Sequence, residues 1–207
     1  KKFSELFGDL DSINSTNNKI EVLKNYFLSN DPIDNSWAIY LLTGKSNKRF
    51  ISGRYLKNLF SQIYEYPQWL IDTCYLKVGD SAEVITLLLK NKTNSRKKKL
   101  SNISLNELLS ETIPALSKLN EEEKNLEIKN IWETLPEDNH LIFNKILTGT
   151  FRVGVSIGLI TKSISKLINI DEEIISHRLM GDFKPSIDSY EFLINKNINL
   201  QELNSKP

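Results

Sequence analysis

The sequence predicts an all-α fold of about a dozen short helices, and three observations predict it. Apolar residues recur at intervals of three and four along nearly the whole chain, which places them on one face of a helix. Asp80, Ser104 and Asn120 each precede a glutamate by three positions, a pair that can satisfy backbone donors at a helix start. Only residues 151–155 alternate as a strand does, and they are too few to found a sheet.

Apolar sets at helical spacing define the expected helices in chain order. Breaks are expected at Asp31-Pro32, at Pro67 and at Gly79, because proline and glycine commonly end helices. The sets run over Phe3–Leu10, Ile20–Phe27, Trp37–Leu41, Leu56–Ile63, Trp69–Cys74, Leu105–Leu116, Leu126–Leu135, Ile142–Leu147 and Leu159–Leu167.

Composition excludes several classes of protein and site. Cys74 is the only cysteine, so an internal disulfide is impossible, and with two histidines far apart in sequence we expect no metal site. The longest apolar runs fall far short of the roughly 20 residues of a membrane span. The start of the chain lacks the apolar segment of a signal peptide. We therefore expect a cytoplasmic protein that has no membrane partner.

Large side chains at helical apolar positions are expected in the core. Trp37, Trp69 and Trp132 lie at such positions, which favours core packing over base stacking. Cys74 lies among apolar neighbours and is expected to be a core thiol.

The formal net charge of +1 hides a strong segregation of charge along the chain. Three windows, residues 43–64, 84–106 and 141–170, carry 15 of the 27 bases and none of the 26 acids. If the windows converge in space, they form a basic face of the kind that binds phosphates. The alternative is that each window is a half-buried helix whose exposed side is basic.

The chain also contains an internal repeat. Leu-Thr-Gly at residues 42–44 and 147–149 is followed by an arginine, Arg49 or Arg152, and later by Gly-Asp at residues 79–80 and 181–182. The arginine precedes a leucine, Leu56 or Leu159, by seven positions in both copies. We expect one all-helical domain, residues 1–207, whose related halves, roughly 1–90 and 103–207, are joined by a basic loop, 90–102. The two copies should superpose about a pseudo-twofold axis with their arginines on one face.

Each copy combines a glycine turn, a basic loop and a helix start. A glycine after a helix permits left-handed backbone and close approach of a ligand. The next helix can begin at Ser52 or Ser156, which directs its positive dipole end toward an anion. Arg49 or Arg152 adds a bidentate phosphate donor. Two such copies would bind two backbones of one duplex.

No catalytic constellation occurs in the sequence. The phosphate loop GxxxxGK[ST], the metalloprotease motif HExxH and the hydrolase motif GxSxG are all missing. We therefore expect no catalytic residue and no cofactor in this chain.

Two segments, residues 144–156 and 177–181, resemble the N-terminal DNA-binding domain of ATP-dependent DNA ligases, the bacterial branch above all. They read Asn-Lys-Ile-Leu-Thr-Gly-Thr-Phe-Arg-Val-Gly-Val-Ser and His-Arg-Leu-Met-Gly. Residues 37–45, 48–49 and 78–83 are similar to the same family. The resemblance covers nearly the whole chain and implies an all-α, pseudo-symmetric clamp on the minor groove of nicked duplex DNA.

The resemblance implies sequence-independent contacts with the DNA backbone from both basic loops. The expected contact residues are Gly44, Lys45, Lys48, Arg49, Arg54, Gly149, Thr150, Arg152, Gly154 and Ser156. The basic loop 90–102 is either a solubilising loop or a phosphate-contacting tether, and in the second case it adds Arg96, Lys97, Lys98 and Lys99.

The resemblance also implies a missing part. Ligases of this family seal nicks in DNA repair and replication through a lysine-AMP intermediate at a Lys-x-Asp-Gly motif, which this sequence lacks. The chain ends about where the adenylation domain would begin, so we interpret it as an excised, monomeric N-terminal domain. ATP and magnesium are then expected only in the missing catalytic domain, and the parent protein among the DNA of a bacterial nucleoid.

A second hypothesis remains open. The chain could be a helical protein-interaction module whose basic face binds an acidic partner. Duplex binding with a steep dependence on salt separates the two hypotheses, because counterion release is characteristic of DNA.

Overall fold

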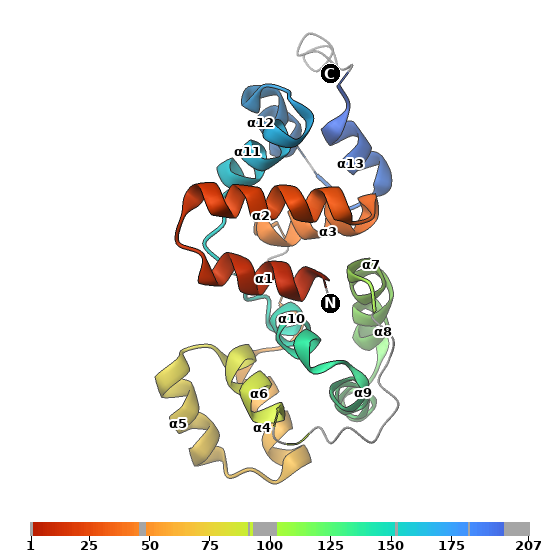
Figure 1. Cartoon of the computed structure of the whole chain (residues 1–207). Helices are drawn as coiled ribbons and strands as arrows, with labels where there is room; N and C mark the ends of the chain where they lie inside the picture. The colour runs from red at the N-terminus through yellow and green to blue at the C-terminus, as the bar shows by residue number, and fades with distance from the viewer. Residues whose placement is uncertain are drawn as a thin grey trace. The chain divides into compact units, whose positions relative to one another are not determined.

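The computed structural model describes residues 2–45, 49–90, 92, 103–151, 153–181 and 183–196. The described residues form helices and no strand, so the all-α prediction is confirmed (Figure 1). Within the alternating segment, Val153 and Gly154 lie in a bend. No helix in the described ranges is both long and apolar enough to cross a membrane.

The chain divides into two compact units, each built from segments of both sequence halves. The middle unit comprises residues 47–151 and the terminal unit comprises residues 2–46 and 152–207. The middle unit contains α4 (Gly53–Tyr64), α5 (Gln68–Val78), α6 (Ser81–Leu89), α7 (Leu105–Glu107), a π-helical turn (Leu108–Thr112), α8 (Ile113–Lys118), α9 (Glu121–Thr134) and α10 (Glu137–Thr148). The terminal unit contains α1 (Lys2–Ser12), α2 (Thr16–Ser29), α3 (Pro32–Leu42), α11 (Ile157–Ile168), α12 (Glu172–Met180) and α13 (Ile187–Ile194).

The two copies of the sequence repeat form matching series of helices. α2 and α9 have 14 residues each, and α4 and α11 have 12 residues each. α4 and α11 follow serine caps, Ser52 and Ser156, at the helix starts that the sequence predicts. Both helices end in a left-handed residue, Glu65 with φ 55° or Asn169 with φ 56°. Helices α2 to α6 therefore correspond to α9 to α13.

Corresponding helices are exchanged between the two units. In the middle unit α10 packs on α6, and in the terminal unit the equivalent helix α3 packs on α13 (Figure 1). Each unit thus combines the first helices of one copy with the last three helices of the other. The sequence halves 1–90 and 103–207 describe the repeat, whereas the compact units mix the two.

The observed caps correct the register of the repeat by one residue. Ser52 and Ser156 are equivalent, so the counterpart of the buried Leu56 is Ile160, which is also buried. The pairing of Leu56 with Leu159 was therefore wrong. Leu159 lies one position before the buried Ile160 on α11 and is itself only half-buried.

The predicted capping pairs begin α6, α7 and α9. The side chains of Asp80, Ser104 and Asn120 each accept a hydrogen bond from the N–H of the glutamate three residues later, at 3.0–3.1 Å. Glu123 also accepts the backbone N–H of Asn120, which completes a capping box at α9.

The core expectations for large side chains hold only in part. Trp132 is fully buried, as predicted, whereas Trp69 is 69% exposed and its prediction was wrong. Trp37 and Cys74 are half-buried. The cause at Trp69 and Cys74 is shared, since both lie on α5, which buries only Ile71.

A buried polar contact joins three helices of the middle unit. Trp132 on α9 donates its indole N–H to Asn144 Oδ1 on α10 at 2.9 Å. Asn144 Nδ2 donates to Thr86 Oγ1 on α6 at 3.0 Å. Asn144 is completely buried, so its amide satisfies polar atoms that water cannot reach.

Replacement of Asn144 by alanine should destabilise the middle unit by about 1–3 kcal/mol, because the indole N–H of Trp132 loses its acceptor in the core. Urea unfolding followed by tryptophan fluorescence measures the loss. Asn130→Ala is the matched control, since Asn130 is exposed on α9. Equal unfolding midpoints for the two variants would contradict a structural role for the Asn144 amide.

Candidate nucleic-acid interface

The loop that precedes α4 is fixed by the end of α10. The N–H groups of Phe50 and Ile51 both donate to the carbonyl oxygen of Leu147, at 3.0 and 2.9 Å. Leu147 belongs to the second copy of the repeat, whereas the loop belongs to the first. The basic loop of one copy therefore lies against the Leu-Thr-Gly turn of the other.

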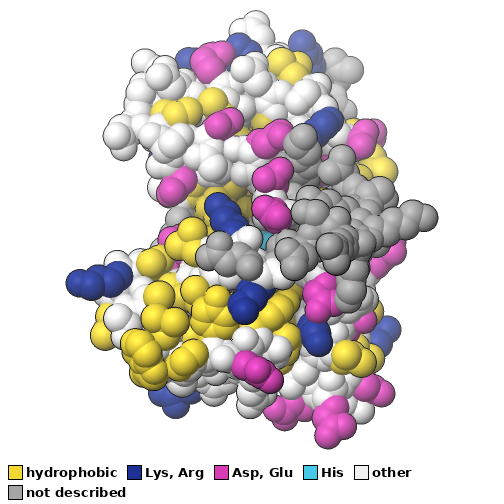
Figure 2. Space-filling model, turned by 60° about the horizontal axis from the view of Figure 1, so that its bottom comes forward, with side chains coloured by type: hydrophobic (Ala, Val, Ile, Leu, Met, Phe, Trp, Pro, Cys, Tyr) yellow, Lys and Arg dark blue, Asp and Glu magenta, His cyan; other side chains and the backbone are white. Residues whose placement is uncertain are grey.

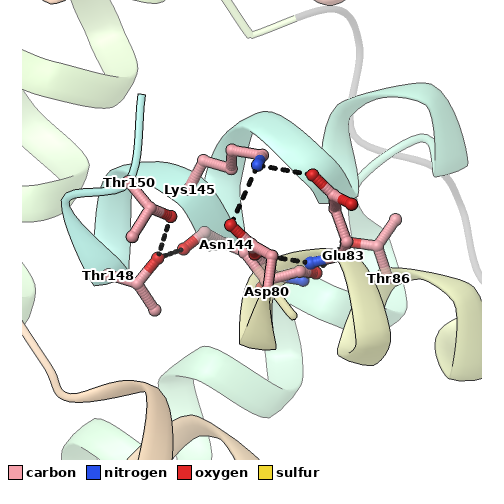
Figure 3. A network of polar contacts seen from close by, with 8 residues as sticks. Asp80, Glu83, Thr86, Asn144, Lys145, Thr148 and Thr150 are labelled. Carbon is pink, nitrogen blue, oxygen red and sulfur yellow. Dashed lines mark hydrogen bonds and ion pairs between the residues drawn. The ribbon is translucent and has the colours of Figure 1, made fainter. Parts of the chain in front are cut away.

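The Leu-Thr-Gly turns have the backbone that the sequence predicts. Gly44 and Gly149 are left-handed, with φ 71° and 67°. After Gly149, the N–H of Thr150 donates to the carbonyl of Lys145 and closes the end of α10. The hydroxyls of Thr148 and Thr150 lie 2.9 Å apart at this turn (Figure 3).

These elements surround a hollow of about 410 Å³ in the middle unit. Its walls combine the start of α4, the start of α6, the end of α5 and the turn after α10. The lining residues are Arg49, Ser52, Gly53, Arg54, Lys57, Tyr75, Gly79, Asp80, Ser81, Thr148 and Thr150. Three of these, Arg49, Arg54 and Thr150, are DNA contacts expected from the sequence, and Ser52 is the helix start that the sequence predicts.

The N-termini of α4 and α6 converge at this hollow. A methyl group built on Gly53 would lie 2.6 Å from the Ser81 hydroxyl oxygen and 3.0 Å from its Cβ, so only glycine permits this approach. The first N–H groups of a helix have no acceptor within the helix, and its dipole is positive at that end. Two such ends in one hollow favour an anion there.

The charges around the hollow leave its arginines available. Arg49 and Arg54 are exposed and make no ion pair with another described residue. Lys57 is occupied, since it pairs with Asp72 at 2.6 Å. The hydrogen bond from Lys57 also lowers the pKa of Asp72, which therefore stays ionised beside its partner.

The acid at the hollow, Asp80, is ion-paired from inside the unit. Lys145 extends from α10 to Asp80 at 3.1 Å and to Glu83 at 2.7 Å (Figure 3). Asp80 also accepts the N–H of Glu83 as the cap of α6. Lys145 is 3% exposed, so this base of the third window serves the fold and is not a surface charge.

Lys45 was expected to contact DNA, but the structure gives its ammonium group other partners. Lys45 Nζ donates to the carbonyls of Leu179 at 2.9 Å and Gly181 at 2.7 Å. These carbonyls end α12, where a cation is favourable because the helix dipole is negative. Lys45 therefore holds a helix end within the terminal unit.

The second basic loop lies in the terminal unit before α11. Gly154 is left-handed with φ 61°, and Ser156 caps α11 by accepting the N–H of Leu159 at 3.3 Å. Lys19 Nζ donates to the carbonyls of Val153 and Gly154, both at 3.3 Å. Sequence reasoning missed Lys19.

The repeat could have revealed Lys19. Its equivalent at the start of α9 is Lys124, whose ammonium group lies 5.5 Å from the centre of the Phe50 ring, in the loop before α4. A lysine on α2 or α9 thus contacts the basic loop in each unit. Lys48, Arg152 and the four bases Arg96, Lys97, Lys98 and Lys99 lie outside the described residues.

Comparison with known proteins identifies the family. Residues 1–165 match the model of the family described as DNA ligase N terminus. The chain belongs to this family. No curated protein matches the chain in a sequence search. As a DNA ligase N-terminal domain, the chain has DNA as its general partner, which agrees with a hollow bordered by arginines and helix N-termini.

Substitution of Gly53 tests the convergence of α4 and α6. Gly53→Ala should destabilise the ligase domain by about 1–3 kcal/mol, because the new methyl overlaps Ser81. Ser81→Gly in the same chain should recover part of the loss. Gly8→Ala on α1 is the control, since a methyl there meets nothing within 4 Å, and it should be neutral or stabilising. Denaturant midpoints measure all four chains, and a Gly53→Ala protein as stable as Gly8→Ala would contradict the close approach.

Proposed function

We propose that this chain binds duplex DNA through its sugar–phosphate backbone, without reading base sequence, as the DNA-binding domain of an ATP-dependent DNA ligase. The observation that carries the proposal is the hollow of the middle unit. There two helix N-termini meet two exposed arginines, Arg49 and Arg54, beside an acid that is ion-paired with Lys145.

Phosphate is the ligand that this chemistry fits. An arginine offers a planar pair of donors that matches two phosphate oxygens, and a helix N-terminus offers backbone N–H groups to the same anion. Contacts of this kind position a protein on DNA but carry no sequence information. Binding should therefore be similar on unrelated duplexes and should weaken as salt rises.

The repeat supports a second contact from the terminal unit. Gly154 and Ser156 lie in the loop before α11, which is equivalent to the basic loop before α4. Two loops of one kind suit the two backbones that border the minor groove, which is the groove the resemblance implies. The resemblance also implies a nick in the duplex, and we propose nicked duplex as the preferred form, to be compared directly with intact duplex of the same sequence.

The proposal assigns the chemistry of sealing to another part of a parent protein. Lysine adenylation needs a Lys-x-Asp-Gly motif, which this sequence lacks, so ATP and magnesium would be bound by an adenylation domain of the same parent chain. The present domain would act as a monomer in repair or replication on the DNA of the bacterial nucleoid. Its own task is to hold the nicked duplex.

Loss of one hollow arginine should weaken duplex binding without unfolding the domain. Arg49→Ala and Arg54→Ala should each cost up to about 1.5–3 kcal/mol of binding free energy, and less where the exposed side chain is poorly fixed. The slope of log affinity against log salt should fall by about one unit for each. Fluorescence anisotropy at several salt concentrations measures both quantities.

Lys118→Ala is the matched control for these arginine variants, because Lys118 is an exposed base on α8 and does not line the hollow. It should change affinity and slope little. An equal loss for all three variants would mean that binding reflects overall charge and not the hollow.

The isolated chain should not become adenylated. Incubation with ATP and magnesium should leave its intact mass unchanged, because no lysine stands in a Lys-x-Asp-Gly motif. Mass spectrometry after denaturation measures this directly. An AMP adduct on any lysine of the chain would refute the assignment of sealing to another domain.

A further inference from the structure

Helix α5 exposes most of its apolar side chains. Ile71 is its only buried residue, whereas Trp69 is 69% exposed and Leu76 is 82% exposed. Figure 2 shows hydrophobic side chains gathered in a patch at the lower left of that view. A contiguous exposed apolar patch commonly marks an interaction surface.

The two most exposed apolar side chains of α5, Trp69 and Leu76, lie on one stripe of the helix. At 100° per residue, Trp69, Thr73 and Leu76 lie on the side of the helix opposite Ile71, at the spacing of i, i+4 and i+7. The Thr73 hydroxyl donates to the carbonyl of Trp69 at 2.8 Å, so its donor is used within the helix. The stripe is about 10 Å long, from seven helical rises of 1.5 Å.

Positive charge borders one side of this stripe, and a neutral ion pair borders the other. Lys77 is exposed on one side and makes no ion pair with another described residue. On the other side Asp72 is neutralised by Lys57, whose ammonium group lies 4.4 Å from the centre of the Tyr75 ring. A partner that complements this surface therefore carries apolar side chains bordered by carboxylates.

The repeat shows that the stripe is particular to the first copy. In α12, the counterpart of α5, Ile175 is buried as Ile71 is, and Met180 is exposed as Leu76 is. The positions equivalent to Trp69 and Thr73 hold Glu173 and His177. If both copies bound a duplex in the same way, the first copy would not need an apolar stripe that the second copy lacks.

The shape of the stripe favours a protein over DNA. A helix with its side chains is about 10–12 Å across, so α5 cannot enter the minor groove, which is about 6 Å wide, along its length. The major groove admits a helix, but base edges there are read by polar side chains. In this stripe the Thr73 hydroxyl donates within the helix, so the indole N–H of Trp69 is the one side-chain donor left for a base edge. A second helix packs on such a ridge through apolar residues at the same spacing.

We propose that the Trp69–Thr73–Leu76 stripe docks an amphipathic helix of a protein partner, with an apolar face flanked by aspartate or glutamate. This interaction goes beyond DNA binding and does not rest on it. The hollow uses Tyr75 and Gly79 of α5, whereas the stripe uses Trp69 and Leu76, so the partner and the DNA occupy different residues.

A displayed library of peptides of about 16 residues, long enough to form a helix, is screened for binding to the intact chain. The enriched peptides are then measured by anisotropy on the chain and on the double variant Trp69→Gln with Leu76→Gln. Leu126→Gln on α9 is the control, because Leu126 is 68% exposed on another helix of the same unit. Lys77→Glu tests the charged border, and duplex affinity and sedimentation are measured for every variant.

The proposal expects enriched peptides that have apolar residues at intervals of three and four and an excess of acids. They should bind the double variant about tenfold or more weakly, since an exposed tryptophan anchor commonly carries this much. Lys77→Glu should weaken them too, and Leu126→Gln should not. Duplex affinity should be the same for the double variant and the unaltered chain, whether or not DNA binding uses the hollow.

Three results would overturn the proposal. The first is a library with no peptide that prefers the unaltered chain to the double variant. The second is a loss of duplex affinity in the double variant and not in Leu126→Gln, which would make the stripe a DNA surface. The third is a concentration-dependent dimer that the double variant abolishes, which would make a second copy the occupant.

Discussion

The candidate site depends on the two hydrogen bonds that the Leu147 carbonyl accepts from Phe50 and Ile51. They hold the basic loop of the first repeat copy against the Leu-Thr-Gly turn of the second. Without them Arg49 and the start of α4 would have no fixed relation to Thr148 and Thr150. A buried backbone carbonyl with two donors is a stable anchor, because leaving either N–H unpaired in the interior is costly. The exchange of α3 and α10 between copies thus builds the hollow.

A second constraint is electrostatic. Asp80 caps α6 and lines the hollow, so its charge would oppose an anion there. Lys145 reaches both Asp80 and Glu83 from α10, the helix that also presents the turn. One helix therefore fixes the loop and supplies the ion-pair partner of the acid beside it. Gly53 completes the arrangement, because it lets the N-termini of α4 and α6 approach closely enough to act on one anion.

Local features of this fold could be predicted from the sequence. The caps at Ser52, Ser156 and Asn120 follow from side chains that satisfy backbone N–H groups a few residues away, and the left-handed Gly44 and Gly149 follow from the end of a helix. Both features depend on residues that are close together in the sequence, so the sequence pattern is enough to predict them. The exchange of helices between the copies could not be predicted in this way. The same apolar faces would be buried whether the helices of one copy packed on each other or on helices of the other copy.

Other features of the structure could not be predicted from local sequence either. Lys45 and Lys145 lie in acid-free windows, yet their partners come from elsewhere in the chain, the end of α12 and the start of α6. Charge along the sequence cannot reveal such partners. Trp69 has the spacing of a core residue, and periodicity identifies the apolar face of α5 without telling whether another helix covers it. The π-helical turn at residues 108–112 gives no local signal and has no role in the site.

Amide hydrogen exchange with and without a saturating nicked duplex at low salt tests the central claim most directly. That claim is that the start of α4, the start of α6 and the turn after α10 bind one backbone together. The account predicts slower amide exchange in the peptides that contain Gly53, Ser81 and Thr150. It predicts unchanged amide exchange in the part of α5 around Trp69. Unaltered exchange at these three places on a chain that is fully bound to DNA would contradict it.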